Sequence, residues 1–426
     1  MPLTVLLDPV RILLGSGREP IETGAALIQS DQLVALGDEA RAQAAQQGVP
    51  AQSASHQLLA PCLVDPHSIL EEPFGSLNET LSSLCHAAAR AGYGQVALLP
   101  QAEVWRDRIE RLQGYRNRDN GDVLLHLWGA LSLDGKGQQL SSHADLLAQG
   151  AIGLCDGEAM PAASLLERSL LLGEMGSAPV LLAPRDPKLQ GDGMVREGVE
   201  TLRAGWPMDP IASETLPLGQ LLELQRLFPQ RSLVAMNLST AEGVHRLQSA
   251  DVKPKASVHW WHLVTDRSQL APTSMGWCVT PSLGGVEDRN TLTTALRHRL
   301  ITAIGVHAVP LDTEDCLLPP GQRRPGLVGH QLVLPLLWQR LVEDQGWSIA
   351  ELWEALSFGP SSLLQQPEEE LRLGSNRWLL FDPDMTWTAS ADHPNAAQAA
   401  NQPLLGTTVK GAVVACGLRG PAPRND

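Results

Sequence analysis

The feature that most constrains the fold is a long alternation of apolar segments with helical segments, which runs from about residue 58 to residue 365. Short apolar runs predict strands, and each is followed by a longer stretch with the apolar spacing of a helix. The expected strands cover residues 95–99, 124–128, 150–154, 179–183, 232–236, 257–261 and 302–306, and the expected helices include 77–91, 163–175, 216–228 and 290–300. Seven or eight such units predict an α/β fold with a parallel (β/α)8 barrel.

Both ends of the chain lack this alternation. The N-terminal end predicts short strands at 3–7, 11–14, 26–29 and 33–36, and the C-terminal end predicts strands at 378–381, 387–388 and 409–415. We therefore expect the barrel to span residues 58–365 and a small β-sandwich-like domain to be built from residues 1–57 together with 366–426. A chain of 426 residues is long enough for one large barrel and a smaller unit.

Charge and cysteine content limit the possible binding partners of the protein and its cellular compartment. The net charge of −15 argues against nucleic acid and anionic membrane as partners. The six cysteines are scattered without a C-x-x-C pair, which favours reduced thiols in a cytoplasmic protein. The N-terminus has no basic and apolar stretch typical of a signal peptide, and no apolar run approaches the roughly 20 residues of a membrane span.

One segment points to metal chemistry. The residues around Asp65 and His67 read as a buried strand that runs into a polar turn. Two histidines at positions i and i+2 of a strand point the same way and can reach one ion. Here the first position is His67, but the second is Ile69, which cannot bind a metal.

Several further segments, in this order along the chain, resemble the type I dihydroorotases of the amidohydrolase superfamily. They are APCLVDPH at 60–67, EPFG at 72–75 with 79–80, AARAGYG at 88–94, GAIGLCDG at 150–157, residues 210–214, 237–240 and 287–289, GLVGHQ at 326–331 and PLLGTTVKG at 403–411. The resemblance covers nearly the whole chain. It implies a TIM-like barrel in which metal ions activate a hydroxide that attacks a ring amide carbonyl.

The resemblance also implies where the metal ligands should be, and most of them are missing. The residual metal candidates are His67 and Asp156, which falls at the position of the bridging acid, and His262 becomes a third only under a looser strand register. The lost ligand positions are Ile69, Ala183 and Asn237. Because a zinc site usually needs three protein ligands, we expect no cofactor.

The catalytic and substrate-binding positions of the family have changed as well. Aligned on Pro310, the catalytic aspartate falls at His307, and a shift of one residue moves it to Val306. The arginine that holds the substrate carboxylate falls at Glu71, which would repel that carboxylate, and the pocket asparagine falls at Thr280. We therefore expect no catalytic and no substrate-binding residue at these positions.

Three functional hypotheses remain open. The first is a dihydroorotase-like pseudoenzyme of pyrimidine biosynthesis that supports aspartate transcarbamoylase, or associates with itself, as a non-catalytic partner. The second is an active dihydroorotase or other cyclic amidohydrolase with a rebuilt site that uses zinc, for example as a single metal ion. The third is a small-molecule binding module that keeps the barrel pocket. Under the first hypothesis, His67 and Asp156 persist because they hydrogen-bond at the ends of barrel strands.

Overall fold

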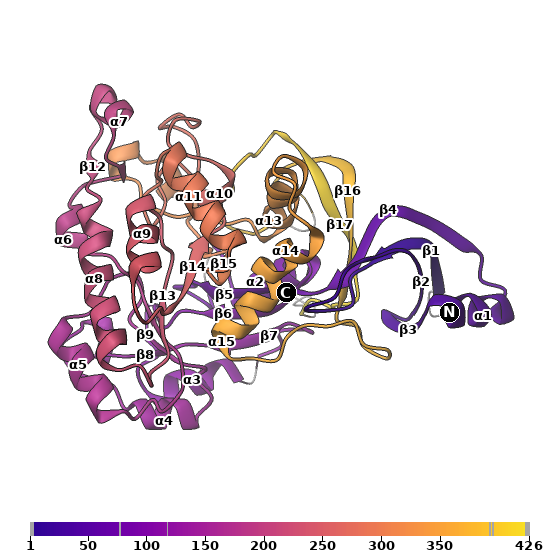
Figure 1. Cartoon of the computed structure of the whole chain (residues 1–426), viewed down its shortest axis with the longest axis horizontal. Coiled ribbons are helices and arrows are strands. Elements are labelled where there is room, and N and C mark those ends of the chain that lie inside the picture. The colour runs from indigo at the N-terminus through magenta and orange to yellow at the C-terminus, as the bar shows by residue number, and fades with distance from the viewer. Residues whose placement is uncertain (1–3, 76–77, 117, 392, 394–395, 422–426) are drawn as a thin grey trace.

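The computed structural model describes residues 4–75, 78–116, 118–391, 393 and 396–421. The molecule is elongated, with a large α/β barrel at one end and a small β-sheet at the other (Figure 1). In the described part, no helix has the length and apolar character needed to cross a membrane. All six cysteines are unpaired.

Eight parallel strand positions form the barrel within the described residues. They are β5 (Leu63–Ser68), β6 (Tyr93–Leu98), β7 (Leu124–Leu127) continued by β8 (Gly129–Ala130), β9 (Leu154–Cys155), β10 (Val180–Leu182), β13 (Leu233–Ala235), β14 (Lys255–His259) and β15 (Ala303–Gly305). Neighbours in the chain are neighbours in the sheet. The barrel closes next to β5 and β15, where the Ile69 amide donates to the Ala308 carbonyl at 2.8 Å. The predicted (β/α)8 barrel is confirmed.

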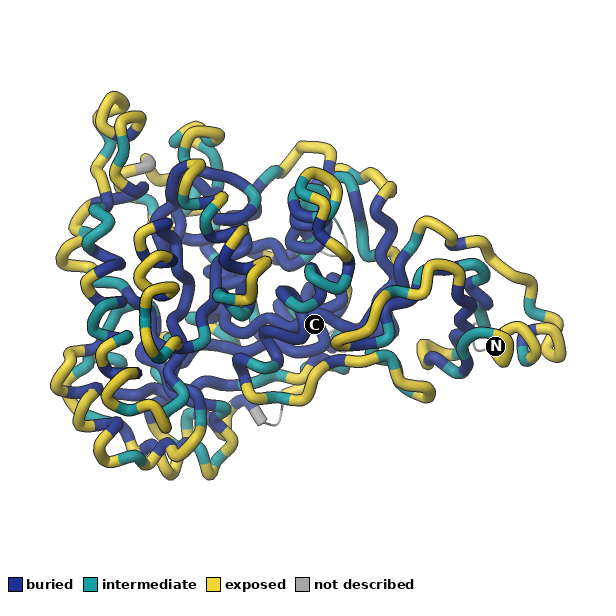
Figure 2. Tube along the Cα trace, viewed as in Figure 1, coloured by how far each residue is buried: buried dark blue, intermediate teal, exposed yellow. Residues whose placement is uncertain are grey.

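Helices surround the strands and present an exposed outer face (Figure 2). The longer ones are α2 (Leu81–Arg90), α3 (Ile109–Arg116), α5 (Ala163–Leu172), α8 (Ala212–Leu227), α9 (Ala241–Ser249), α11 (Val286–Arg297) and α13 (His330–Leu337). The shorter ones are α4 (His143–Ala148), α6 (Pro187–Gln190), α7 (Val199–Ala204), α10 (Trp261–Val264), α12 (Thr313–Leu317), α14 (Ile349–Trp353) and α15 (Gly359–Leu364), with η1 (Leu133–Gly135), η2 (Pro320–Gln322), η3 (Trp338–Glu343) and η4 (Glu354–Phe358).

Most of the barrel strands are buried on both faces, which explains why they are apolar without alternation, whereas β7 begins at Leu124, which is 51% exposed. In β10, Val180 and Leu182 pack in the layer between strands and helices, whereas Leu181 packs inside the barrel. The interior is filled by apolar side chains, including Trp128, whose indole Nε1 donates to the Pro66 carbonyl at 3.1 Å. The barrel is therefore a packed core and not a pore.

The small domain is a six-stranded sheet that joins both ends of the chain. Its order is β17-β16-β4-β1-β2-β3, with β1 (Thr4–Ile12), β2 (Ile21–Gln29), β3 (Gln32–Leu36), β4 (Ala51–Pro61), β16 (Trp378–Thr388) and β17 (Thr408–Cys416). Helix α1 (Gly37–Gln47) packs on the sheet through Ala40 and Ala44. The segment before β16 returns to the β3 edge of this sheet, where the Gly374 backbone N–H donates to the Leu33 carbonyl at 2.7 Å. Strand β4 spans residues 57 and 58, so it belongs to the sheet and leads directly into the barrel.

Some elements differ from the sequence-based expectation. Strand β1 is continuous where two strands were expected, because the chain absorbs Pro9 by shifting its register between Leu7 and Val10. The strand expected at 257–261 ends at His259, and α10 begins two residues later. An additional parallel pair, β11 (Val195–Arg196) with β12 (Met208–Asp209), stands on the excursion between β10 and α8.

Candidate functional site

The positions singled out in the sequence meet at one end of the barrel. Parallel barrel strands end on the same face, and side chains there are placed to act together. At these ends lie His67 on β5, Asp156 after β9, Ala183 after β10, Asn237 after β13 and His307 after β15. The alignment therefore selected residues of a single barrel mouth, although their side chains do not form one cluster.

A row of hydrogen bonds occupies the centre of this mouth. The His307 Nε2 atom lies 3.0 Å from the Glu158 Oε1 atom, and the Nδ1 atoms of His307 and His67 lie 3.2 Å apart. The His67 Nε2 atom lies 2.8 Å from the Ser257 hydroxyl, which also accepts the Asn237 backbone N–H at 3.0 Å. With a neutral His307, His67 donates from Nδ1 and accepts at Nε2; with a protonated His307 these roles reverse. Both ring nitrogens of His67 are engaged in either arrangement.

Burial and charge set the protonation of this row. The His67 ring packs so tightly on Gly305 that a Cβ atom there would lie 2.2 Å from the ring. Burial, followed by the neighbouring His307, lowers the pKa of His67 to about 3. Burial tends to raise the pKa of Glu158, but Arg185 and His307 outweigh it and leave that pKa below its usual value. The row therefore combines a neutral His67 with an ionised Glu158 at neutral pH.

The other two residual metal candidates point elsewhere. The Asp156 carboxylate accepts the Ser132 backbone N–H at 2.7 Å and the Ser132 hydroxyl at 2.5 Å, and burial raises its pKa. His262 lies on α10, with its Nε2 atom 3.4 Å from the Ser282 carbonyl, and burial lowers its pKa to about 4. Among the described residues, no three His, Cys, Asp or Glu side chains are arranged to hold a metal ion.

Two of the three lost ligand positions have been absorbed by the barrel interior. Ile69 and Ala183 belong to the apolar cluster that fills the barrel. The remaining cavity, lined by Ala183, Asn237, Thr280 and His307 among others, has a volume of about 10 Å³. That is roughly the room of one water molecule, whereas small-molecule pockets typically measure several hundred Å³.

Glu71, at the position of the family's substrate-binding arginine, is paired with a positively charged side chain. The Arg324 Nη2 atom lies 2.7 and 2.8 Å from the two carboxylate oxygens of Glu71. This pairing offsets the repulsion that the sequence predicted for Glu71. Arg324 comes from the segment after α12, and its own side chain is 48% exposed, so the pair remains in contact with solvent.

Sequence reasoning missed two charged residues of the mouth, Glu158 and Arg185. Both stand two positions beyond a recognised site residue, Asp156 in one case and Ala183 in the other. Both line the same cavity as His307. Inspecting the second residue after each strand-end position would have found them.

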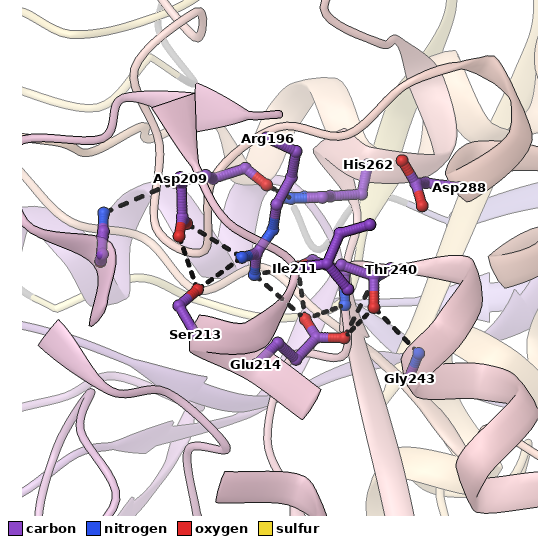
Figure 3. Close-up of polar contacts among 12 residues, drawn as sticks. Arg196, Asp209, Ile211, Ser213, Glu214, Thr240, Gly243, His262 and Asp288 are labelled. Carbon is purple, nitrogen blue, oxygen red and sulfur yellow. Dashed lines mark hydrogen bonds and ion pairs between the residues drawn. The ribbon is translucent and has the colours of Figure 1, made fainter. Parts of the chain in front are cut away.

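A second polar cluster lies beside the mouth and is shown in Figure 3. Glu214 on α8 accepts the backbone N–H groups of Ser239 and Thr240 at 2.9 and 3.1 Å, and both of their hydroxyls at 2.5 Å. Arg196 on β11 bridges Glu214 at 3.3 Å and Asp209 at 3.0 Å. The family-like segments 210–214 and 237–240 thus meet in a buried network that fastens the loops after β12 and β13.

Sequence comparison with known proteins assigns this chain to a family. No family model matches the sequence. A "Probable dihydroorotase-like protein" of Synechocystis sp. is 32% identical, over 97% of this chain and 98% of that protein. The chain belongs to the dihydroorotase-like amidohydrolases. A "Dihydroorotase-like protein" of Pseudomonas putida is 28% identical over 83% of the chain, and a "Dihydroorotase" of Geobacter metallireducens is 25% identical over 91%.

Solved structures agree with the fold of this dihydroorotase-like chain. The L-hydantoinase of Arthrobacter aurescens superposes with a TM-score of 0.76 over 98% of the chain and 95% of the hydantoinase, at 18% identity. The dihydropyrimidinase of Brevibacillus agri also gives 0.76, over 98% of the chain and 94% of that protein. At these identities the likeness establishes the architecture alone.

The neutral histidines of the mouth predict a loss of stability in mild acid. His67 and His262 have folded pKa values of about 3 and 4, against 6.5 for an ordinary histidine. Below pH 6.5 the unfolded state therefore binds more protons than the folded state, and stability falls as the pH drops from about 6.5 towards 4. Urea unfolding between pH 7.5 and about 4.5 should show this slope, and His67→Gln should reduce it by up to about 1.4 kcal/mol per pH unit. The same slope in His67→Gln and in a His245→Gln control, on the exposed side of α9, would contradict this assignment.

Proposed function

We propose that this protein is a non-catalytic, cytosolic dihydroorotase-like protein of pyrimidine biosynthesis that acts through a protein partner. The observation that carries the proposal is the state of the former metal site. Both nitrogens of His67 are engaged by His307 and Ser257, and Asp156 is engaged by Ser132. The relatives named dihydroorotase support the pathway.

The residues present do not fit a metal centre of the family type. Zinc in a catalytic site takes three protein ligands of nitrogen, oxygen or sulfur. Ile69 and Ala183 offer carbon only, and they pack in the barrel interior. Asn237 is an amide and a poor substitute for an imidazole ligand. In the part of the chain that the structure describes, no set of side chains is arranged to hold the metal ion whose bound hydroxide is the nucleophile of the family reaction.

Purified protein is expected to carry far less than one equivalent of zinc and to show no hydrolysis of dihydroorotate or cyclisation of carbamoyl-aspartate. The reason is the absent donor set at the mouth. Metal content and turnover should be measured on one sample, with and without added zinc. The Geobacter metallireducens dihydroorotase, prepared in parallel, is the positive control. Stoichiometric zinc together with zinc-dependent turnover would overturn the proposal.

One observation favours the alternative of a rebuilt one-metal site. The Nδ1 atoms of His67 and His307 lie 3.2 Å apart, a separation that two ligands of one tetrahedral ion would also show. Among the described residues no third His, Cys, Asp or Glu completes such a site, and Glu158 bonds the opposite nitrogen of His307. Zinc that is lost together in His67→Gln and His307→Gln variants would support this alternative.

The partner that we propose is aspartate transcarbamoylase. A supporting role needs a surface away from the barrel mouth. Barrel helices run back towards the opposite end, and there the last turns of α5 and α8 expose Leu171, Leu172 and Leu227, at 67%, 57% and 50%. The Arg231 side chain, just after α8, donates to the Gly176 carbonyl at 3.1 Å and ties these two helix ends together. Grouped exposed leucines are typical of contact surfaces.

A complex with the transcarbamoylase of the same cell is expected to form and to be lost in the double variant Leu171→Asp, Leu172→Asp. Charges placed in an apolar contact surface lose their hydration, so binding should weaken at least about tenfold. Sedimentation velocity of the mixed proteins measures the complex. Leu317→Asp, which changes a leucine that is 79% exposed on α12, is the matched control. A mixture that sediments as two separate species would refute the partner.

A further inference from the structure

The small cavity at the barrel mouth contains polar groups with no partner. The Asn237 side chain is only 4% exposed, and neither its Oδ1 nor its Nδ2 atom has a hydrogen-bond partner. Asn237 also adopts a positive φ of 54°. An unpaired buried amide typically costs about 1–3 kcal/mol. The donor and the acceptor of this amide are therefore both available to a bound molecule.

Arg185 on the same cavity wall is a second group without adequate partners. Its side chain is 14% exposed, and its closest anionic contact is the Glu158 Oε1 atom at 3.7 Å, beyond hydrogen-bond distance. Its Nε atom is buried without a partner. Burial lowers the pKa of Arg185, as expected for a cation that is poorly compensated. A guanidinium in such surroundings favours an additional anion.

We propose that this cavity binds a small planar carboxylate-type anion, with bicarbonate as the best match, between Arg185 and Asn237. The forked guanidinium matches two oxygens of such an anion, and the Asn237 Nδ2 atom supplies a further donor. The hydroxyl of bicarbonate can donate to the Asn237 Oδ1 atom, which acetate cannot do. The site thus favours a negative ion beside Ala183 and Asn237, two positions where the family resemblance predicts ligands of a positive one.

Entry of the anion needs a local movement of the wall. The cavity of about 10 Å³ has room for a water molecule only. Met236 lines the same cavity, and its unbranched thioether side chain adapts its shape more readily than the branched side chains of the barrel interior. Glu158 opposes the anion, because it lies near Arg185 and is itself ionised. Anion affinity therefore depends on Arg185 and Glu158 in opposite directions.

The test is thermal unfolding of the full chain in sodium bicarbonate at pH 8, with sodium chloride replacing it at constant ionic strength. Wild-type protein should be stabilised by bicarbonate with a concentration dependence of one site, and more weakly by acetate. Arg185→Gln should weaken binding at least about tenfold, as expected for the loss of a charge-assisted pair. Arg185→Lys should bind with intermediate affinity. Glu158→Gln should bind more tightly than wild type.

The control is Arg226→Gln, which removes an arginine that is 52% exposed on α8 and should leave the response unchanged. The proposal is wrong if bicarbonate and chloride stabilise wild type equally, or if both Arg185 variants respond like wild type. It is also wrong if Glu158→Gln binds no more tightly. If Arg185→Gln does not fold, Arg185→Lys and Glu158→Gln still decide. The result is independent of hydrolytic activity, so a failure here leaves the proposed non-catalytic role untouched.

Discussion

Replacing Glu214 with alanine is expected to lower the free energy of unfolding by about 3–5 kcal/mol, because the change breaks a buried network of charges. The Glu214 carboxylate is 1% exposed and accepts hydrogen bonds from two backbone amides and two hydroxyls, contributed by Ser239 and Thr240. Its loss leaves four donors unpaired. It also leaves Arg196, itself 1% exposed, with Asp209 as its remaining counter-charge. Urea unfolding at pH 7.5 measures the effect.

The matched control lies on the same helix. Glu223 on α8 pairs with Arg226 at 2.7 Å, but both side chains are more than half exposed. Glu223→Ala should therefore cost no more than about 1 kcal/mol. Equal losses in the two variants would mean that the network around Glu214 contributes no more than a surface ion pair.

Restoring a single metal ligand is expected to fail, and to cost stability. Ile69→His places an imidazole where the side chain is 1% exposed and packed in the barrel interior. A buried polar group without a partner costs about 1–3 kcal/mol. Zinc should still not bind, since Ala183 and Asn237 remain non-ligands and His67 remains engaged by Ser257. Turnover of dihydroorotate should stay at the level of buffer.

The control for packing is Ile69→Val, which removes one methylene and should cost about 0.5–1.5 kcal/mol. Zinc content, turnover and urea unfolding should be measured on both variants and on Ala183→His. Appreciable hydrolysis by either histidine variant would show that one ligand was the only obstacle. That outcome would favour the rebuilt enzyme over the non-catalytic partner.

The architecture could be predicted from the sequence because most barrel strands are buried on both faces. A strand such as β10 must be apolar throughout, and it must be followed by a helix that covers it. The excursion that carries β11 and β12 could not be predicted, since two-residue strands have no periodicity. The ends of several elements also shifted by a few residues, as for α2, which begins at Leu81 after the extended Thr80, whereas the expected start at residue 77 lies outside the described residues.

The location of the candidate site could be predicted from the sequence, but the contacts among its side chains could not. Strand ends gave the positions of His67 and His307, because parallel strands finish on one face. Which partner each side chain takes depends on residues far away in the chain. Arg324 reaches Glu71 across 253 positions, and no local pattern records that pairing. Charge alone predicted repulsion at Glu71, and the structure supplies the opposite charge from another loop.

The position of β4 also fixes the order in which the molecule can be completed. In the small sheet, β4 pairs with β1 on one side and with β16 on the other, through residues Leu58–Pro61 and Trp378–Phe381. The whole barrel lies between those two segments in the chain. A ribosome must therefore make the entire barrel before β16 emerges, and until then one edge of β4 has no strand beside it. During synthesis this edge of β4, at the junction between sheet and barrel, stays unpaired until β16 is made. A chaperone or a second nascent chain could pair with it in that interval.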